Sequence, residues 1–523
     1  MTAFPFLSVL TAVPLIGAIT ILGLGDRQKS RARIVALLFS LIALALTLIL
    51  WHWFDSTSGE LQFQEWHAWI PSLGAEYRLG IDGLGLVMLL LSALVVTMSI
   101  AASRQIRERE RLYFSLVLFL EAGLFGTFTA LNFFHWFIFW ELSLIPAFFL
   151  IQLWGGPQRV SAATQFFVYM MVGSVALLLA FLALFHCTGT FDFLRLSQLA
   201  REGQLVPDLA SNLAWHRFTP DQIALFIFGG VFLGFAVKVP LIPFHTWLPS
   251  TYAEAPTGTT MLLTGAMSKM GVYGFLRIVL PIFSPQVRSM LTPLLWLAVF
   301  TVVLSAFAAL AQKDLKRMFA YSSINHLGYC MLGIFAVASL IGKAAALTTT
   351  ALTTTQTAAL DGVILQMFNH GLTAAALFWF VALLEARSGG LRGLNDFGGL
   401  RRVVPIFTGL MGITLFSSLG LPGLNGFIGE FLIFRGAFPL ATWAASLSLL
   451  GLLVTAIFML TILQRVFSGP LNERWSSMPD LAVTERLALL SPIALMFALG
   501  IFPQLILGVI NSTVIRLVQQ VRF

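Results

Sequence analysis

The chain has 523 residues, of which 58% are hydrophobic and only 10% are charged. Soluble domains carry about 25% charged residues, so this composition excludes a soluble protein. The formal net charge is +8, but basic residues in a membrane protein mainly hold loops on the cytoplasmic side, and we expect no nucleic-acid partner. Cys187 and Cys330 lie in apolar runs and match no zinc or iron–sulfur spacing. The sequence therefore predicts no cofactor and no metal in this chain.

Apolar stretches of about 20 residues, the length of a membrane-crossing helix, recur along the whole chain. The stretch from Phe4 to Leu24 lacks a basic start and a cleavage site, so it is predicted to be a retained span. The sequence predicts an all-α polytopic membrane protein with about 14 transmembrane helices. They are expected near residues 5–24, 33–54, 83–102, 112–131, 132–153, 162–187, 222–250, 258–280, 288–309, 314–340, 358–385, 403–438, 440–467 and 485–510.

The charges between these stretches predict which links share a side of the membrane. Alternate links are rich in Lys and Arg and should face the cytoplasm or its equivalent. The acid-rich link from Asp55 to Asp82 and the balanced link from Thr188 to Asp221 then face the other side, together with both termini. The basic links contain Arg27, Lys29, Arg31 and Arg33, then Arg104, Arg107, Arg109 and Arg111, then Arg159, then Lys313, Lys316 and Arg317, then Arg387, Arg392, Arg401 and Arg402.

Three segments do not fit simple spans. The low-complexity run from Thr348 to Thr357 is predicted to be a loop. In the stretch 235–249, Pro240 and Pro243 follow Lys238, and in the stretch 419–434 Pro422 and several glycines precede Glu430. Proline and glycine interrupt the helical hydrogen bonds, and one broken helix in each half is typical of transporters with internal repeats. The simpler alternative is a pair of proline kinks without function.

Ionisable residues lie inside several apolar stretches. A charge at the bilayer centre costs at least about 2.5 kcal/mol, so each one needs a reason. The chain has only six lysines, and two of them are in such positions. Snorkelling or structural pairing explains Glu121 alone as well as function does, but it explains the whole series poorly. The series consists of Glu121, Glu141, Lys238, Lys269, His326, His370 and Glu430.

Polar neighbours of the two histidines follow helical spacing. Ser322, His326 and Tyr329 form one stripe, with Asn325 beside it; the second stripe contains Gln366, Asn369, His370 and Thr373. Such stripes are expected to face the bundle interior and to hold water. Hydrogen bonding between helices is an alternative for the amides and hydroxyls, but imidazole also passes protons near neutral pH.

Lys238 and Glu141 are predicted to form a proton switch. Burial favours the neutral lysine, whereas a nearby carboxylate favours the ammonium. Movement of the carboxylate away from Lys238 would therefore release a proton, and its return would reload the lysine.

The motifs around these residues resemble the antiporter-like subunits of respiratory complex I and its photosynthetic relatives, which are also similar to subunits of multi-subunit sodium/proton antiporters. The resemblance covers most of the chain and is strongest from Phe137 to Phe438. Glu430 stands where sister chains usually have lysine, so the chain is most similar to chain M, also called chain 4 or D. The motifs are FWELSLIPAFFLIQLWGG, FAVKVPLIPFHTWLP, SKMGVYGFLR, QKDLKRMFAYSSINHLGY, QMFNHGLTAAALF, NDFGGL and LGLPGLNGFIGEF.

This resemblance implies roles for individual residues. Glu141 and Lys238 would be the input pair, Lys269 the central relay, His326 and His370 the bridging histidines, and Glu430 the terminal residue. The implied fold has N-terminal helices in 1–111, a first five-helix repeat in 112–280, a second, inverted repeat in 288–467 and a C-terminal helix in 485–523.

The resemblance also implies a setting. The chain would be a proton-translocating membrane-arm subunit of an NAD(P)H- or ferredoxin-driven quinone oxidoreductase, without a redox centre of its own. Its partners would be sister antiporter-like chains, other membrane-arm subunits and lipids. It would lie in a bacterial inner membrane or in a cyanobacterial or chloroplast thylakoid membrane.

Four positions depart from the family pattern. Asn132 stands where an Asp is often found, Ser250 replaces an Asp, Tyr252 replaces a His, and Thr260 lies where another His often occurs. These departures bring the family's proton route near the first break into question. They also indicate a divergent paralogue, and the cyanobacterial forms specialised for carbon dioxide uptake would fit this description.

Two other functions would place a chain of this composition in a membrane. A subunit of a stand-alone cation/proton antiporter is the alternative, and a lysine in place of Glu430 would favour it. A polytopic membrane enzyme has little support, because no metal triad or nucleophile motif is present and GLNGFIG lies within a broken membrane segment, not after a strand.

Overall fold

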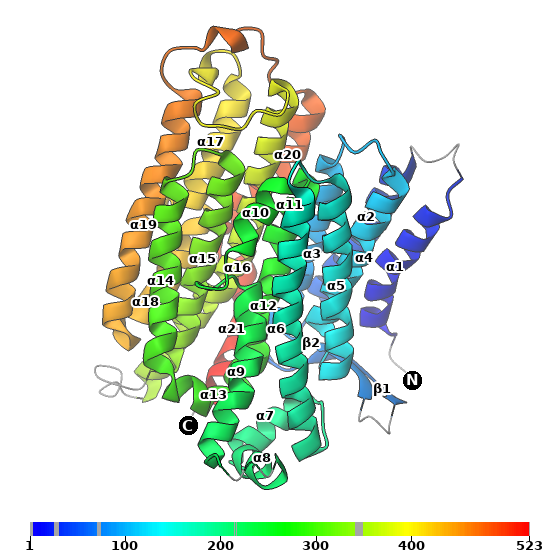
Figure 1. Ribbon diagram of the computed structural model, residues 1–523, viewed down its shortest axis with the longest axis vertical. Coiled ribbons are helices and arrows are strands. Elements are labelled where there is room, and N and C mark those ends of the chain that lie inside the picture. The colour runs from blue at the N-terminus through cyan, green and yellow to red at the C-terminus, as the bar shows by residue number, and fades with distance from the viewer. Residues whose placement is uncertain are drawn as a thin grey trace.

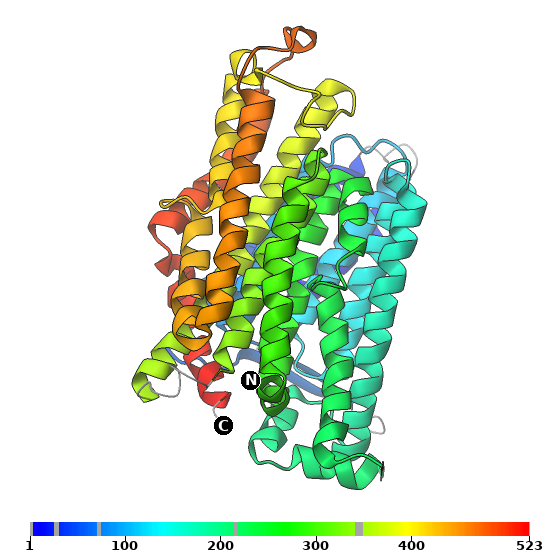
Figure 2. The same cartoon turned by 60° about the vertical axis from the view of Figure 1, so that its left-hand side comes forward.

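The computed structural model describes residues 4–25, 31–70, 75–213, 215, 217–339 and 349–521. These residues form a bundle of roughly parallel helices (Figures 1 and 2). Within them lie 11 helices long and apolar enough to cross a membrane, and two shorter apolar helices. The predicted helical membrane fold is confirmed, whereas the count of about 14 spans is not.

The first half of the chain supplies one side of the bundle. Its elements are α1 (Phe6–Leu22), α2 (Ala32–Trp53), β1 (Gln62–Ile70), β2 (Ala75–Ile81), α3 (Gly83–Ala102), α4 (Glu110–Thr129), α5 (Phe133–Trp154), α6 (Arg159–Thr188), α7 (Phe193–Arg201), α8 (Leu205–Leu213), α9 (Pro220–Lys238) and α10 (Trp247–Glu254).

The central rod from Thr257 to Ser289 follows, and it is 94% buried over its most apolar window. It consists of α11 (Thr257–Leu262), the π turn η3 (Leu263–Met267), α12 (Ser268–Gly274), the π turn η4 (Phe275–Val279) and α13 (Leu280–Ser289). Single π turns inside helices are frequent at functional sites.

The second half supplies the other side. Its elements are α14 (Leu291–Leu310), α15 (Leu315–Val337), α16 (Thr349–Ser388), the 3-10 turn η6 (Leu400–Arg402), α17 (Pro405–Leu419), α18 (Asn425–Leu440), α19 (Thr442–Ile462), the π turn η7 (Leu463–Phe467), the 3-10 turn η8 (Glu473–Trp475), α20 (Val483–Ile501) and α21 (Gln504–Gln520).

Both predicted breaks are present. At the first, α9 ends at Lys238 and α10 begins at Trp247, and the freed backbone N–H of Ile242 donates to the Thr301 hydroxyl of α14 at 3.0 Å. At the second, α17 ends at Leu419 and α18 begins at Asn425, whose carbonyl accepts from the Asn369 amide of α16 at 2.6 Å. Side chains of neighbouring helices thus bond backbone groups that the breaks expose.

The link from Asp55 to Asp82 contains a structure that the all-α prediction lacks. β1 and β2 pair antiparallel, with Glu65 opposite Leu79 and Ala68 opposite Glu76. The Glu65 carboxylate accepts from the Leu7 backbone N–H at 2.7 Å, at the start of α1. The hairpin is therefore held by contacts with distant residues, which local sequence patterns do not reveal.

Two predictions about boundaries are wrong. The Thr-rich run is helical from Thr349 onwards, while Thr348 lies outside the described residues. Its Thr354 and Thr355 hydroxyls bond carbonyls one turn earlier, which lets the polar side chains remain within a helix. The expected span at 485–510 is divided at Phe502 and Pro503 into α20 and α21.

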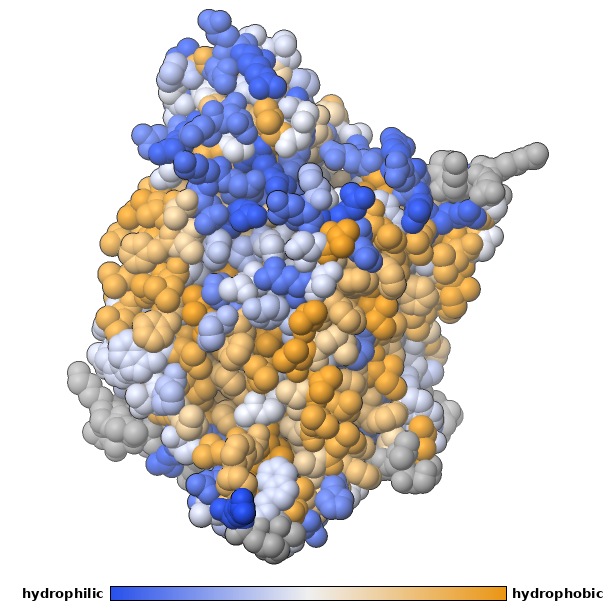
Figure 3. Space-filling model, viewed as in Figure 1, coloured by the Kyte–Doolittle hydropathy of each residue, from blue (hydrophilic) through white to orange (hydrophobic). Residues whose placement is uncertain are grey.

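The helices end on two distinct faces. Figure 1 places both ends of the chain, β1–β2, α7 and α8 at one end of the molecule, which we call the terminal end. The links before α4, α6, α15 and α17 lie at the opposite, basic end, where Leu315 bonds Arg392 and Arg104 bonds Thr484. Figure 3 shows an apolar belt between polar ends. The described basic links thus share one side, as predicted; Arg27 and Lys29 lie outside the described residues.

Candidate functional site

Four of the predicted site residues lie in a row across the bundle interior, each in contact with the next. The Lys269 ammonium of α12 lies 2.8 Å from Nδ1 of His370 on α16. The rings of His370 and His326, from α16 and α15, have centroids 5.1 Å apart. Nδ1 of His326 lies 3.0 Å from Oε1 of Glu430 on α18. The structure therefore joins Lys269, His370, His326 and Glu430 into one polar path.

Neighbouring polar groups hold this path in place. The Gln366 amide lies 3.4 Å from His326 Nδ1 and donates to Glu430 Oε1 at 3.3 Å. The Ser418 hydroxyl lies 3.3 Å from Nε2 of His326. Both imidazole nitrogens of His326 thus have partners, which fixes the ring orientation that proton passage requires. The sequence pattern did not single out Ser418, although it lies directly before the second break.

All four side chains of the path are buried, with Lys269 completely enclosed and His370, the most exposed, at 7%. Buried ionisable groups in a membrane are costly unless they face one another or water. Their arrangement as donor and acceptor pairs offsets part of that cost. Chemically, a polar path of one amine, two imidazoles and one carboxylate can pass protons in either direction.

The predicted input pair lies apart from this path. Lys238, at the end of α9, is 2% exposed, and its ammonium lies 3.8 Å from the centre of the Trp140 ring. Within the described residues no ion pair or hydrogen bond joins Lys238 to Glu141 or to Lys269. Among the residues that the structure describes, the buried Oε1 of Glu141 has no hydrogen-bond partner. The aromatic contact was not predicted, although Trp140 directly precedes Glu141.

Glu121, the remaining member of the sequence series, is not brought into the path. It lies in α4, is completely buried, and neither carboxylate oxygen has a hydrogen-bond partner within the described residues. Asp361 of α16 is also a buried carboxylate. The sequence pattern does not single it out as a candidate site residue, because it lies at the start of an expected span, where acidic residues are common. Its Oδ1 atom also lacks a hydrogen-bond partner in the described part of the chain.

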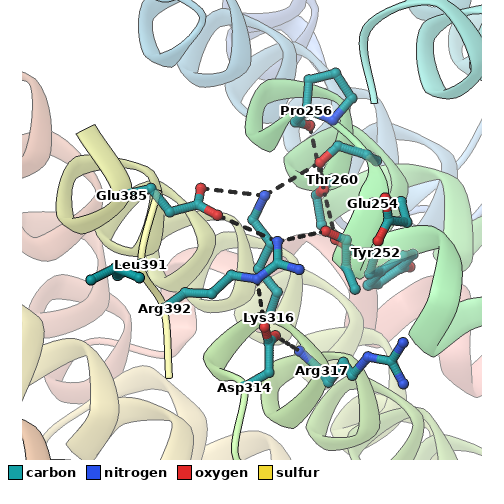
Figure 4. Close-up of polar contacts among 12 residues, drawn as sticks. Tyr252, Glu254, Pro256, Thr260, Asp314, Lys316, Arg317, Glu385, Leu391 and Arg392 are labelled. Carbon is teal, nitrogen blue, oxygen red and sulfur yellow. Dashed lines mark hydrogen bonds and ion pairs between the residues drawn. The ribbon is translucent and has the colours of Figure 1, made fainter. Parts of the chain in front are cut away.

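Lys316 belongs to a basic link by its sequence context, but its side chain is buried within the bundle. It lies in the first turn of α15, is 4% exposed, and pairs with Glu385 at 3.4 Å (Figure 4). Arg392 joins Asp314 at 2.5 Å to Glu385 at 3.4 Å. Burial disfavours the Arg392 charge, but the two carboxylates outweigh this and raise its pKa. Sequence position gave no sign of this cluster, because its members come from separate links.

Three of the four departures from the family pattern have local partners. Asn132 caps α5 by accepting from the Phe134 N–H at 3.0 Å, Ser250 bonds Gln165 at 2.7 Å, and Thr260 bonds backbone carbonyls. The Tyr252 hydroxyl is fully buried beside the hydroxyls of Thr264 and Ser268, and it makes no hydrogen bond of normal length within the described residues. No group of three or more His, Cys, Asp or Glu in the described residues is arranged to hold a metal ion.

Two broken helices beside a buried file of ionisable side chains define a class of membrane protein, the polytopic subunits that conduct ions through discontinuous helices. Comparison with known proteins identifies the family within this class. The chain belongs to the NADH:quinone oxidoreductase/Mrp antiporter transmembrane family, whose model matches residues 130–355 and 337–458. The resemblance inferred from the motifs is thereby confirmed.

Similar sequences cover nearly the whole chain. NADH-quinone oxidoreductase subunit M of Rhodobacter capsulatus is 33% identical over 98% of this chain and 96% of its own. F(420)H(2) dehydrogenase subunit M of Methanosarcina mazei is 35% identical over 98% of each chain. NAD(P)H-quinone oxidoreductase chain 4 2 of Thermosynechococcus vestitus is 32% identical over 96% of this chain and 89% of its own.

Solved structures agree with this assignment. A chain of respiratory complex I from Thermus thermophilus matches with a TM-score of 0.83 and 27% identity, covering 99% of this chain and 100% of that chain. A chain of the Mrp complex from Dietzia matches with a TM-score of 0.81, 20% identity and full coverage of both chains, which shows the shared fold. The chain is thus an integral membrane subunit of the complex I type.

Proposed function

We propose that this chain is a proton-translocating membrane-arm subunit of a complex I-type quinone oxidoreductase, assembled with sister antiporter-like chains. The observation that carries the proposal is the row of contacts from Lys269 through His370 and His326 to Glu430, in which a ring contact joins the two histidines. The relatives at 30% identity or more support the electron-transfer setting, because they are named as subunits of NADH-, NAD(P)H- and F420H2-driven enzymes. Electron transfer itself belongs to other subunits.

In this proposal Lys238 and Glu141 form the input switch. Lys238 is held against an aromatic face, which stabilises an ammonium by about 2 kcal/mol when it is desolvated. A movement of Glu141 toward or away from it would change its charge. Because Lys269 is a second cation in the same dry interior, a charge on Lys238 would favour proton transfer from Lys269 to His370.

The remaining transfers follow the contacts in order. Lys269 gives a proton to His370, the proton moves to His326 across the closely spaced rings, and Glu430 accepts it from Nδ1 of His326. Glu430 then releases it toward the terminal end, because α18 runs from the break in that direction (Figure 1). Gln366 keeps His326 and Glu430 at hydrogen-bonding distance throughout.

We place the two inverted repeats at 112–280 and 288–467, between N-terminal helices in 1–111 and the C-terminal residues 485–523. Each proposed repeat contains one break, between α9 and α10 in the first and between α17 and α18 in the second. This correspondence supports the assignment. The stand-alone cation/proton antiporter is the weaker alternative, because the likeness to the Mrp complex at 20% identity concerns the fold only.

Substitution of Glu430 tests the proposal in the assembled complex. Glu430→Gln keeps the shape and most hydrogen bonds but removes the exchangeable charge, so the protons per electron that this chain contributes should be lost, while the sister chains keep their share. Glu430→Asp keeps the charge and should retain part of the pumping. Translocation is measured in membrane vesicles and normalised to electron transfer.

A matched control is Glu473→Gln in the exposed turn η8, which should pump normally. If Glu430 has only a structural role, Gln should be tolerated and Asp should be worse. A fully pumping Glu430→Gln complex would remove this residue from the pathway and overturn the proposed file.

A further inference from the structure

A cavity at the terminal end lies between the Asp55–Asp82 link, α7, the central rod and α21. Its volume is about 530 Å³, and Figure 1 shows α7, the hairpin and the C-terminus at this end. Five arginines line it against three carboxylates, so the lining carries more positive than negative charge. The charged residues are Glu60, Arg78, Asp82, Asp192, Arg195, Arg201, Arg277 and Arg516.

Each of the three carboxylates of this cavity is already matched by one arginine. The pairs are Asp82–Arg277 at 2.6 Å, Asp192–Arg78 and Glu60–Arg516. Opposite charges in direct contact cancel much of each other's field. The excess positive charge of the cavity therefore comes from the two remaining arginines, and both of them belong to α7.

The two remaining arginines share one face of α7. Arg195, Gln198 and Arg201 follow one another at intervals of three residues, and all three are exposed and line the cavity. Within the described residues, no ion pair or side-chain hydrogen bond joins Arg195 or Arg201 to another group. A guanidinium has five N–H donors and no acceptor. This face of α7 therefore offers hydrogen bonds and charge that suit an anion.

Other contacts fix the orientation of α7. The Asp192 carboxylate caps the helix, because it accepts from the backbone N–H groups of Leu194 at 2.7 Å and of Arg195 at 3.1 Å. The Ser197 hydroxyl donates to the carbonyl oxygen of Pro281 in α13 at 3.4 Å. These bonds hold the arginine face of α7 toward the cavity.

The rest of the lining is largely apolar and lies near the membrane boundary. Because α7 begins shortly after the membrane-crossing helix α6 ends at Thr188, it lies at the level of the phospholipid headgroups. Positive charge and apolar walls therefore meet at this level. The leucines of the walls are Leu61, Leu84, Leu131, Leu194, Leu276 and Leu517.

We propose that this cavity binds a phosphate group between Arg195 and Arg201. A guanidinium presents parallel N–H donors that match two phosphate oxygens, and two such groups supply both the donors and the charge that a phosphate needs. Two sources offer this group at the membrane surface, namely the headgroup of an anionic phospholipid and free inorganic phosphate. The site goes beyond the proposed function, because no member of the polar path from Lys269 to Glu430 lines this cavity.

Ligand-induced stabilisation of the purified, delipidated complex tests the site. The thermal unfolding midpoint is measured during titration with phosphatidylglycerol in one arm and with inorganic phosphate in the other, since a ligand that binds the folded state raises the midpoint. Phosphatidylcholine, which has no net charge, is the control lipid, and sodium chloride at equal ionic strength is the control salt. At least one of the two phosphate ligands should raise the midpoint beyond its control.

Paired substitutions show whether this stabilisation comes from α7. In the double variant Arg195→Gln with Arg201→Gln, the ligand concentration that gives half of the shift should rise about tenfold, because both charge-assisted contacts are lost. The matched control is Arg401→Gln with Arg402→Gln, which removes the same charge from exposed positions of η6 at the basic end. This control should respond like the native complex.

The two arms distinguish the sources of the phosphate group. A response that depends on α7 and occurs with phosphatidylglycerol alone assigns the site to a lipid headgroup, whereas one that occurs with inorganic phosphate assigns it to the free ion. Equal responses of the α7 variant and the native complex to both ligands would overturn the site. Neither arm measures pumping, so this outcome would leave the proposed function in place.

Discussion

The two buried lysines of the first half have opposite surroundings. Lys269 contacts an imidazole, a hydroxyl and a backbone carbonyl, all of which accept hydrogen bonds from an ammonium. Lys238 contacts the face of Trp140, which itself is held by a bond to Ser174 at 3.1 Å. A ring face attracts a cation without accepting its proton. Lys238 is therefore suited to sensing charge, whereas Lys269 is suited to passing protons.

Replacement of Lys238 tests this division. Lys238→Ala should leave the complex assembled but abolish the share of proton translocation that this chain contributes, because the charge that drives Lys269 is lost. Lys313→Ala, which removes an exposed lysine at the basic end, is the control and should pump normally. The readout is protons translocated per electron in vesicles. An assembled Lys238→Ala complex with an unchanged ratio would exclude Lys238 from the mechanism.

Among the elements, the broken helix α17–α18 packs closely against α16. α16 and α18 approach closely at glycines, since a side-chain carbon at Gly429 would lie 2.6 Å from the Gln366 side chain, and one at Gly362 would lie 2.5 Å from the Ile433 backbone. This closeness brings Gln366 within reach of Glu430. The geometry of the polar path from Lys269 to Glu430 therefore depends on small residues that carry no polar group.

The break itself should tolerate no added side chain at Gly426. A carbon there would overlap the Ser417 carbonyl oxygen, and overpacking of this kind costs about 1–3 kcal/mol. Gly426→Ala should lower the thermal unfolding midpoint of the purified complex and reduce pumping. Gly409→Ala, in the same broken helix but with open space around it, should leave both unchanged. Equal midpoints for the two variants would show that the break is not tightly packed.

Over the whole molecule, the two ends differ in chemistry. The basic end carries a cavity with Lys316, Glu385 and Arg392, while the terminal end carries the hairpin, α7, α8 and both ends of the chain. Basic links mark the cytoplasmic side or its equivalent. The terminal end therefore lies on the opposite side of the membrane.

Accessibility of tags checks this orientation. A tag at the C-terminus and a tag in the Asp55–Asp82 link should be reached from the same side of the membrane, because both lie at the terminal end. A tag near Arg107 should be reached only from the opposite side. Protease protection in sealed vesicles of known orientation measures this. Access to all three tags from one side would refute the arrangement.

Much of the protein is determined by the sequence itself. Apolar length predicts membrane spans, because a helix must satisfy its own backbone within a bilayer. The prolines after Lys238 and the Pro422 region before Glu430 predict both breaks, since they interrupt helical hydrogen bonding locally. Because a buried charge is costly, Lys238, Lys269 and Glu430 also stand out in the sequence as candidate functional residues. These properties depend on near neighbours along the chain.

Only the tertiary structure decided which of these residues meet. Lys269 touches His370, 101 residues later, and not Lys238. Lys316 is buried by Glu385 and by a loop that precedes its own helix, although its sequence context is that of an exposed basic link. Helical periodicity fixes which side chains share a face, but which faces come together depends on packing between distant helices. For the same reason, the β1–β2 hairpin emerged only from the folded chain.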